Sequence, residues 1–311
     1  MHAFHPDLAA ARFIPAFSFG PASARFVRGR SARPAPTPPG VSVQELTVAG
    51  PAGAPAVTLR IFQPSGLTAP APALLWVHGG GLIIGSPEQD DRTNIAFAAE
   101  LGITVAAVRY RLAPDNPAPA AVEDVYAAFR GLLAEAEVLN VDPDRIAIGG
   151  ASAGGGLAAA AALLIHDRGG VQPVFQLLVY PMLDDRTVTR DDMDTRGVRA
   201  WTPKSNRYGW SAYLGQEPGS AGVSAYAAPA RREELSGLPP AWIGVGTLDL
   251  FHDEDVEYAR RLNAAGVPCR LLVVPGAFHG FDAIFAKAGV AQDFWAAQAE
   301  ALREALRPLH G

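Results

Sequence analysis

Six short, almost continuously apolar runs most constrain what this chain can fold into. They cover residues 73–77, 103–108, 145–149, 175–180, 241–246 and 269–275. Strands that are buried on both faces of a parallel sheet have this composition. The stretches between the runs place apolar residues at three- to four-residue spacing, which is typical of amphipathic helices. Strands that alternate with helices predict an α/β fold with a mostly parallel sheet.

Three other segments depart from this pattern. Residues 43–49 and 57–63 alternate polar and apolar side chains, which predicts two antiparallel strands with one solvent-facing side. Residues 1–40 have no regular pattern and end in a proline-rich linker. Residues 184–225 contain several Trp and Tyr side chains and are too many for a plain connection. We therefore predict an N-terminal segment with its linker (1–40), then one α/β domain (41–311) with an insertion at about 184–225.

A Gly-x-Ser-x-Gly sequence lies between a predicted strand and a predicted helix. It reads Gly150-Ala-Ser152-Ala-Gly154, after RIAIG and before GLAAAAALLI. A serine on such a tight turn has strained backbone geometry, and its neighbours must be small because larger side chains would collide with the strand and the helix. This context predicts that Ser152 is a nucleophile. A phosphate-binding loop is excluded because no Gly-Lys-Ser/Thr follows.

A serine nucleophile needs a base, a group that orients the base, and donors for the oxyanion. Asp249 and His279 each follow a predicted core strand, and the chain order Ser152, Asp249, His279 is one known order for such a triad. The acid is less well defined, because the acidic residues 253–255 lie close by. They read as favourable charges at a helix N-terminus.

The sequence His78-Gly79-Gly80-Gly81 follows another core strand. Three glycines leave backbone N–H groups free to approach a tetrahedral oxygen. We expect the His78 side chain to brace this loop rather than to transfer protons. The chain has seven histidines. Of the other five, we expect His166 and His252 to be structural, and His2, His5 and His310, near the termini, to be solvated.

Composition excludes several classes of function. The net charge of −5 without a basic block argues against nucleic acid as a partner. No apolar run reaches membrane-spanning length, and the N-terminus does not read as a secretory signal, so we expect a cytoplasmic protein without stable membrane insertion. The acidic clusters lack metal-binding spacing, so we expect no metal. The single cysteine, Cys269, cannot form an intramolecular disulfide.

Five segments together resemble the hormone-sensitive lipase family of α/β hydrolases, the bacterial family IV carboxylesterases. They are VHGGG, YRLAPDNPAPAAVEDVYAA, GGASAGG, SAYAAPARREELSGLPPAWIGVGTLDLFHDE and FHGF, in family order between residues 74 and 281. The resemblance implies an α/β-hydrolase fold with a mostly parallel, eight-stranded sheet and a small helical cap. The N-terminal segment and the insertion would form this cap. Such enzymes need no cofactor, and many are homodimers.

The resemblance also implies a role for each site residue. Ser152 would be the nucleophile, Asp249 the acid and His279 the base, and the backbone N–H groups of Gly80, Gly81 and Ala153 would bind the oxyanion. We expect support from the motif residues His78, Gly79, Gly150 and Gly154, and a substrate pocket that includes Leu82, Trp201, Trp210 and Phe281. Two positions depart from the family pattern. Ala151 stands where Asp or Thr is frequent, and Leu82 where an aromatic residue is frequent.

The sequence therefore predicts a serine carboxylesterase that hydrolyses small-molecule esters with short to medium acyl chains. An amidase or deacetylase with the same triad is an alternative, because the nucleophile machinery is shared. Epoxide hydrolase and dehalogenase chemistry is disfavoured, since those reactions commonly use a carboxylate at the position of Ser152. A non-catalytic binder on the same fold is a third alternative. His279 argues against it, because such binders tend to lose the base.

Overall fold

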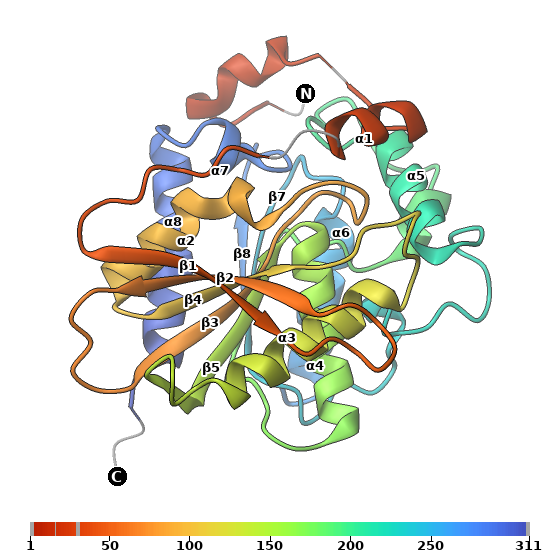
Figure 1. Ribbon diagram of the computed structural model, residues 1–311. Helices are drawn as coiled ribbons and strands as arrows, with labels where there is room; N and C mark the ends of the chain where they lie inside the picture. The colour runs from red at the N-terminus through yellow and green to blue at the C-terminus, as the bar shows by residue number, and fades with distance from the viewer. Residues whose placement is uncertain (1–2, 16, 29–31, 309–311) are drawn as a thin grey trace.

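The computed structural model describes residues 3–15, 17–28 and 32–308. Within this part of the chain, eight strands form one sheet in the order β1-β2-β4-β3-β5-β6-β7-β8 (Figure 1). The strands are β1 (Val41–Val48), β2 (Val57–Pro64), β3 (Ala71–Val77), β4 (Thr104–Arg109), β5 (Val141–Ala151), β6 (Gln176–Val179), β7 (Ala241–Gly246) and β8 (Cys269–Val274). The predicted mostly parallel, eight-stranded sheet is confirmed.

The direction of each strand follows from its sequence pattern. β1 pairs with β2, and β2 with β4, in antiparallel register, whereas all pairs from β4 to β8 are parallel. β5, β6 and β7 are buried in the middle of the sheet, as their apolar runs predict. β8 differs, because most of its residues are only partly buried. It lies at the end of the strand order, so its outer edge has no neighbouring strand within the described residues.

Helices cover both faces of the sheet (Figure 1). They are α2 (Asp91–Leu101), α3 (Ala120–Ala134), α4 (Ala153–Arg168), α6 (His252–Ala264), α7 (Phe281–Ile284) and α8 (Gly289–Ala305). Successive residues of β3 point to opposite faces, as the pleat of a strand requires. Leu75 and Val77 pack in the cluster that contains α3, α4 and α6. Leu74 and Trp76 pack in the cluster that contains α2 and α8.

The N-terminal segment is more ordered than its sequence pattern predicts. It contains a 3-10 helix, η1 (Pro6–Phe13), and a short helix, α1 (Pro21–Arg28), and both begin at a proline, whose fixed φ favours a first helical turn. The expectation that residues 1–40 are irregular is therefore wrong for these two stretches. They show no long apolar period because few of their residues are buried, whereas Phe13, Phe17 and Phe26 are exposed.

The insertion also has structure of its own. It contains η3 (Asp185–Thr189) and α5 (Pro203–Leu214), and η4 (Pro229–Arg231) follows before β7. The N-terminal segment lies against it, since Phe19 N donates to Ser205 Oγ at 2.9 Å and the Ser18 and Thr202 hydroxyls are 2.8 Å apart. In Figure 1 both segments lie at the same end of the molecule, beside the carboxyl ends of the parallel strands. None of the described helices has the length and apolar composition needed to cross a membrane.

Candidate active site

Ser152 occupies the turn between β5 and α4. Its backbone has φ 58° and ψ −124°, a combination that is strained for any residue except glycine. The neighbouring glycines are required by close packing. A Cβ at Gly154 would overlap with the Val77 carbonyl, and a Cβ at Gly150 would lie 2.5 Å from the same oxygen. The small residues around Ser152 therefore let β5 and α4 meet at a turn that holds the hydroxyl group out of the sheet.

His279 and Asp249 reach this turn from the ends of the next strands. Asp249 follows β7 and His279 follows β8. The Ser152 Oγ lies 2.9 Å from His279 Nε2, and His279 Nδ1 lies 2.9 Å from Asp249 Oδ2. Because Nδ1–H donates to the carboxylate, Nε2 is free to accept the serine proton. All three residues are buried, with 5–7% of their surface exposed.

Two aromatic rings and one backbone group fix the orientation of this row. The Tyr180 ring contacts the His279 ring edge-on with centroids 4.8 Å apart, and the Phe251 ring does so at 5.1 Å. The second carboxylate oxygen of Asp249 accepts a hydrogen bond from Phe251 N at 3.0 Å. The two rings therefore hold the imidazole of His279, and the backbone N–H of Phe251 holds the carboxylate of Asp249. We did not single out Tyr180 and Phe251 from the sequence. The only signal is that each comes directly after, or close to, the carboxyl end of a parallel strand.

The loop of residues 78–81 lies against Ser152. A Cβ at Gly79 would come within 3.3 Å of the Ser152 Cβ, so the absence of side chains brings the loop backbone close to the hydroxyl. Gly80 and Gly81 have φ values of 124° and 59°, which L side chains rarely adopt. Ala153 opens α4, where backbone N–H groups have no partner within the helix. Gly80, Gly81 and Ala153 thus come from the two segments that meet at Ser152.

The His78 side chain turns away from the nucleophile. Its ring stacks on Tyr110 with centroids 4.2 Å apart, and Nδ1 donates to the Gly79 carbonyl at 2.8 Å. Tyr110 in turn donates its hydroxyl proton to the His78 carbonyl. Burial lowers the pKa of His78 to about 4, so the ring is neutral at physiological pH. This geometry is that of a brace for the loop, as the sequence suggests.

Of the four residues expected to line the pocket, Trp201 contacts the loop from the insertion. Its ring lies so close to Gly81 that a Cβ at this position would overlap with it. Its Nε1 donates a hydrogen bond to Asn206 Oδ1 at 3.2 Å. Phe19 packs against the same ring, with centroids 5.9 Å apart. The indole of Trp201 therefore links the N-terminal segment and the insertion to the loop of residues 78–81.

The other three pocket residues are more deeply placed. Leu82 is buried with a positive φ of 68° directly after the loop. Trp210 is fully buried on α5 beside Tyr213. Phe281 lies in the core below this region. It is fully buried and packs on Phe294 of α8, with ring centroids 5.0 Å apart, because the first turn of α7 directs it into the core on the α2/α8 face.

Gly81→Ala tests the oxyanion loop. The new methyl group would meet the Trp201 ring at a backbone angle that disfavours alanine, so the loop must shift away from Ser152. We expect kcat for an ester to fall by about 10²–10³, the usual cost of one lost oxyanion donor. Gly53→Ala is the matched control, because Gly53 also has a positive φ of 76° but has open space around its Cα. Equal activity of the two variants would contradict a role for the Gly81 backbone.

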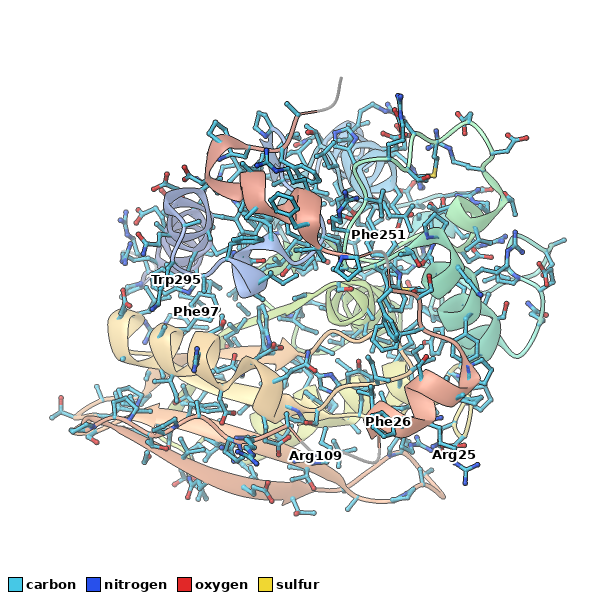
Figure 2. All side chains as sticks on the ribbon, turned by 90° about the horizontal axis from the view of Figure 1, so that it is seen from above. Arg25, Phe26, Phe97, Arg109, Phe251 and Trp295 are labelled. Carbon is cyan, nitrogen blue, oxygen red and sulfur yellow. The ribbon has the colours of Figure 1, made fainter. Side chains whose placement is uncertain are left out.

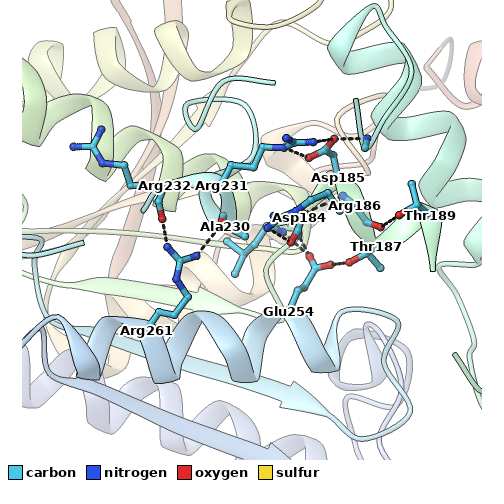
Figure 3. Close-up of polar contacts among 12 residues, drawn as sticks. Asp184, Asp185, Arg186, Thr187, Thr189, Ala230, Arg231, Arg232, Glu254 and Arg261 are labelled. Carbon is cyan, nitrogen blue, oxygen red and sulfur yellow. Dashed lines mark hydrogen bonds and ion pairs between the residues drawn. The ribbon is translucent and has the colours of Figure 1, made fainter. Parts of the chain in front are cut away.

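The acidic residues after Asp249 do not all lie at a solvated helix start. Asp253 is exposed and pairs with Arg190 and His252. Glu254 is buried and accepts hydrogen bonds from the backbone N–H groups of Leu183 and Asp184 and from the Thr187 hydroxyl. Figure 3 shows these contacts. The expectation of favourable surface charge is therefore wrong for Glu254, which fastens the start of the insertion to α6.

Two arginines extend this attachment (Figure 3). Arg231 forms two hydrogen bonds to the buried carboxylate of Asp185, at 2.6 and 2.8 Å. Arg261 of α6 donates to the carbonyl groups of Ala230 and Arg232. Both ends of the segment between β6 and β7 are therefore tied to the helix that follows Asp249.

Asp255 is also buried, which the sequence analysis did not expect. It is fully inaccessible, and neither carboxyl oxygen has a hydrogen-bond partner within the described residues. Burial raises its pKa well above the usual range, and the nearby charges of Glu254 and Asp249 raise it further. Asp255 lies in the first turn of α6, and His279 forms its hydrogen bond with Asp249.

Asp255→Asn tests this burial through stability. Above the ordinary carboxyl pKa of about 4, the unfolded chain loses the Asp255 proton while the folded chain keeps it. The free energy of unfolding of the wild type therefore decreases as pH rises, by about 1.4 kcal/mol per unit from this group, until the folded pKa is passed. The variant lacks this contribution, so its free energy of unfolding relative to that of the wild type increases from pH 5 to pH 7. Urea denaturation at several pH values measures this, and a difference that is independent of pH would contradict it.

Known proteins share this arrangement of strands and site residues. A family model described as the alpha/beta hydrolase fold matches residues 74–283. The chain belongs to this family. The resemblance to hormone-sensitive lipase-like esterases is thereby confirmed. Among curated relatives, esterase LipI of Mycobacterium tuberculosis is 37% identical over 253 residues, which cover 79% of this chain and 77% of the relative. Carboxylesterase NlhH of the same organism is 34% identical over 249 residues, covering 78% and 76%.

Solved structures of other α/β hydrolases agree with the fold over the whole chain. The structure titled bacterial heroin esterase is 40% identical, with a TM-score of 0.90, and the match covers 98% of this chain and 99% of that one. Esterase LipW from Mycobacterium marinum is 31% identical, with a TM-score of 0.84 and coverage of 98% and 97%. These matches include the N-terminal segment, which the five sequence segments do not reach.

Proposed function

We propose that this α/β hydrolase is a serine carboxylesterase in which Ser152, His279 and Asp249 form the catalytic triad. The observation that carries the proposal is the continuous row from the Ser152 hydroxyl through His279 to Asp249, with both contacts at 2.9 Å. The class of reaction agrees with the relatives, which are named as esterases and carboxylic ester hydrolases.

The geometry supports a two-step reaction. As the Ser152 oxygen attacks the ester carbonyl carbon, its proton passes to His279 Nε2, and Asp249 stabilises the imidazolium that forms. His279 then gives this proton to the departing alcohol, which leaves an acyl group on Ser152. A water molecule that has donated a proton to His279 hydrolyses the acyl-enzyme, and the proton returns to Ser152. The acid product and the free enzyme result.

The tetrahedral oxygen would be bound by the backbone N–H groups of Gly80, Gly81 and Ala153. Support comes from the close approach of the glycine loop to Ser152 and from the position of Ala153 at the start of α4. Donors of this kind stabilise a tetrahedral oxyanion most when they are positioned before negative charge develops. The His78 ring and Tyr110, which hold the loop, act only by positioning it.

The N-terminal segment (1–40) and the insertion (about 184–225) are proposed to form a cap, and the remaining part of 41–311 the catalytic domain. Support comes from Phe19 and Trp201, which join these segments directly over Gly81. A bulky indole at this position restricts the space next to the oxyanion loop. We therefore propose esters with short to medium acyl chains as substrates.

Hydrolysis of p-nitrophenyl esters from acetate to palmitate tests this function. We expect turnover that is highest for short acyl chains and falls with chain length, and that Ser152→Ala abolishes. Turnover that rises toward the longest chains would contradict the restricted pocket. If the folded wild type hydrolyses no ester but cleaves the matching anilides, an amidase with the same triad replaces the proposal. If it cleaves neither the esters nor the anilides, a non-catalytic binder on the same fold replaces the proposal.

The proposal includes a homodimer. The outer edge of β8 has no partner strand within the described residues, and such an edge is suited to pairing with a second copy. Light scattering after gel filtration is expected to give twice the 32.6 kDa mass of one chain. A monomer at micromolar concentration would contradict it. The cytoplasmic location stays a prediction of the sequence.

A further inference from the structure

A cavity of about 770 Å³ lies behind the strand that carries Ser152, on the α2/α8 face of the sheet. Its walls come from Trp76 of β3, the ends of β5 and β6, the three helices α2, α7 and α8, and linker residues 33–36. Ala151 lines it, whereas its neighbour Ser152 is not among the described lining residues. The single methyl group at Ala151 keeps the space open. The volume is within the range of small-molecule sites.

Two carboxyl groups in this cavity have no cationic partner among the described residues. Asp90 accepts a hydrogen bond from Trp76 Nε1 at 2.8 Å, and Asp282 accepts one from the Tyr180 hydroxyl at 2.8 Å. Two other acids at the wall are neutralised from outside, because Asp91 pairs with Arg60 and Glu88 with Arg109. The remaining charged lining residues are Glu100, Arg33 and Arg92, all exposed at the surface.

Asp90 and Asp282 are partly buried and close enough for their charges to interact. Burial, together with the neighbouring charge of Asp282, raises the pKa of Asp90 to about 6. Burial likewise raises the pKa of Asp282. Two carboxyl groups that repel each other in a partly dry space are stabilised by any cation that enters it.

Aromatic and amide groups complete the wall. The rings of Trp76, Tyr180 and Trp295 border the cavity. Trp295 stacks on Phe97 between α8 and α2, where Figure 2 shows the two side by side. Its Nε1 and the Nε2 of Gln298 have no hydrogen-bond partner among the described residues, and Gln298 is only 2% exposed. A buried donor without a partner destabilises the folded protein. An occupant of the cavity that carries an acceptor atom would satisfy these donors.

We propose that this cavity binds an organic ammonium ion that also carries a hydroxyl group or another hydrogen-bond acceptor. Asp90 and Asp282 provide the negative charge, and the aromatic rings provide cation–π contacts. Trp295 and Gln298 donate to the acceptor atom. A bare metal ion fits less well, because the cavity is far larger than an ion and its two carboxyl groups are accompanied by aromatic rings rather than by further oxygen ligands. This site does not depend on the proposed esterase activity.

Isothermal titration with choline tests the proposal, with 3,3-dimethyl-1-butanol as the uncharged analogue of the same shape. We expect choline to bind the wild-type protein at least tenfold more tightly than the analogue, because only choline is charged. Tetramethylammonium, which lacks the hydroxyl, is expected to bind more weakly than choline. No choline binding, or equal binding of the uncharged analogue, would overturn the proposal without the need for any variant.

Two variants locate the site. Asp90→Asn keeps an acceptor for Trp76 Nε1 but loses the charge, so we expect choline affinity to fall at least tenfold and the analogue to be unaffected. Trp295→Phe keeps the ring but loses the N–H group, so we expect the preference for choline over tetramethylammonium to decrease. Unchanged choline affinity in Asp90→Asn would overturn the assignment. Wild type with Ser152 blocked by a phosphonate must still bind choline, because loss of binding would place choline in the ester site instead.

Discussion

Replacing His279 with Ala is expected to lower kcat for p-nitrophenyl acetate by about 10⁶, because the serine proton then has no acceptor. His279 Nε2 is the group that contacts the Ser152 Oγ, at 2.9 Å. The Tyr180 and Phe251 rings that hold the imidazole remain, so the space is bounded as before. The measurement is the steady-state rate of the purified variant, with its circular dichroism spectrum compared with that of the wild type.

The matched control for this prediction is His252→Ala. His252 lies three residues after Asp249, and its side chain forms a hydrogen bond with Asp253. We expect it to leave kcat within about twofold of the wild type, since a surface substitution of this kind perturbs stability only slightly. A rate for His279→Ala that is close to that of the control would show that another group accepts the serine proton.

Asp249→Asn is expected to lower kcat by about 10⁴ while the protein stays folded. The amide keeps the shape of the carboxylate but no longer stabilises the imidazolium, and it favours the wrong tautomer of His279. Asn can still accept the hydrogen bond from Phe251 N that holds residue 249 in place. The rate is measured across pH 6 to 9, so that a shift in the pH profile is not mistaken for a loss of kcat.

Asp253→Asn separates the acid from its neighbours. Asp253 is exposed and pairs with Arg190, so we expect nearly unchanged turnover. If Asp253→Asn lost activity and Asp249→Asn kept it, the acid would have to be Asp253 and the geometry at His279 would differ in solution. Loss of activity in both variants would point to a structural effect at the start of α6.

The strands and the site order were predictable because both depend on local sequence. A buried strand reads as an apolar run, and each of Ser152, Asp249 and His279 directly follows one. The carboxyl ends of parallel strands meet at one edge of a sheet, so residues far apart in sequence converge there. The geometry around Ser152 followed from the small residues at 150 and 154, whose packing against the Val77 carbonyl the structure shows.

The parts that were not predictable depend on long-range packing. The 3-10 helix at residues 6–13 and α1 bury few side chains, so no period marks them. Glu254 looks like a surface charge in sequence, and only the fold brings the insertion backbone over it. Phe281 lies only two residues after His279 in the chain. It begins α7, and its ring packs on Phe294 of α8. The cavity behind Ala151 is formed by segments that lie far apart in the chain, which no single stretch reveals.

The most direct test of the account is covalent labelling of the protein with a p-nitrophenyl alkylphosphonate, followed by peptide mass spectrometry. The phosphorus centre resembles the tetrahedral intermediate and leaves a stable ester on an activated nucleophile. The account predicts one phosphonyl group for each chain, on Ser152, with loss of esterase activity in proportion to labelling and no rapid labelling of His279→Ala. A label on another serine, or full inhibition with Ser152 unmodified, would contradict it.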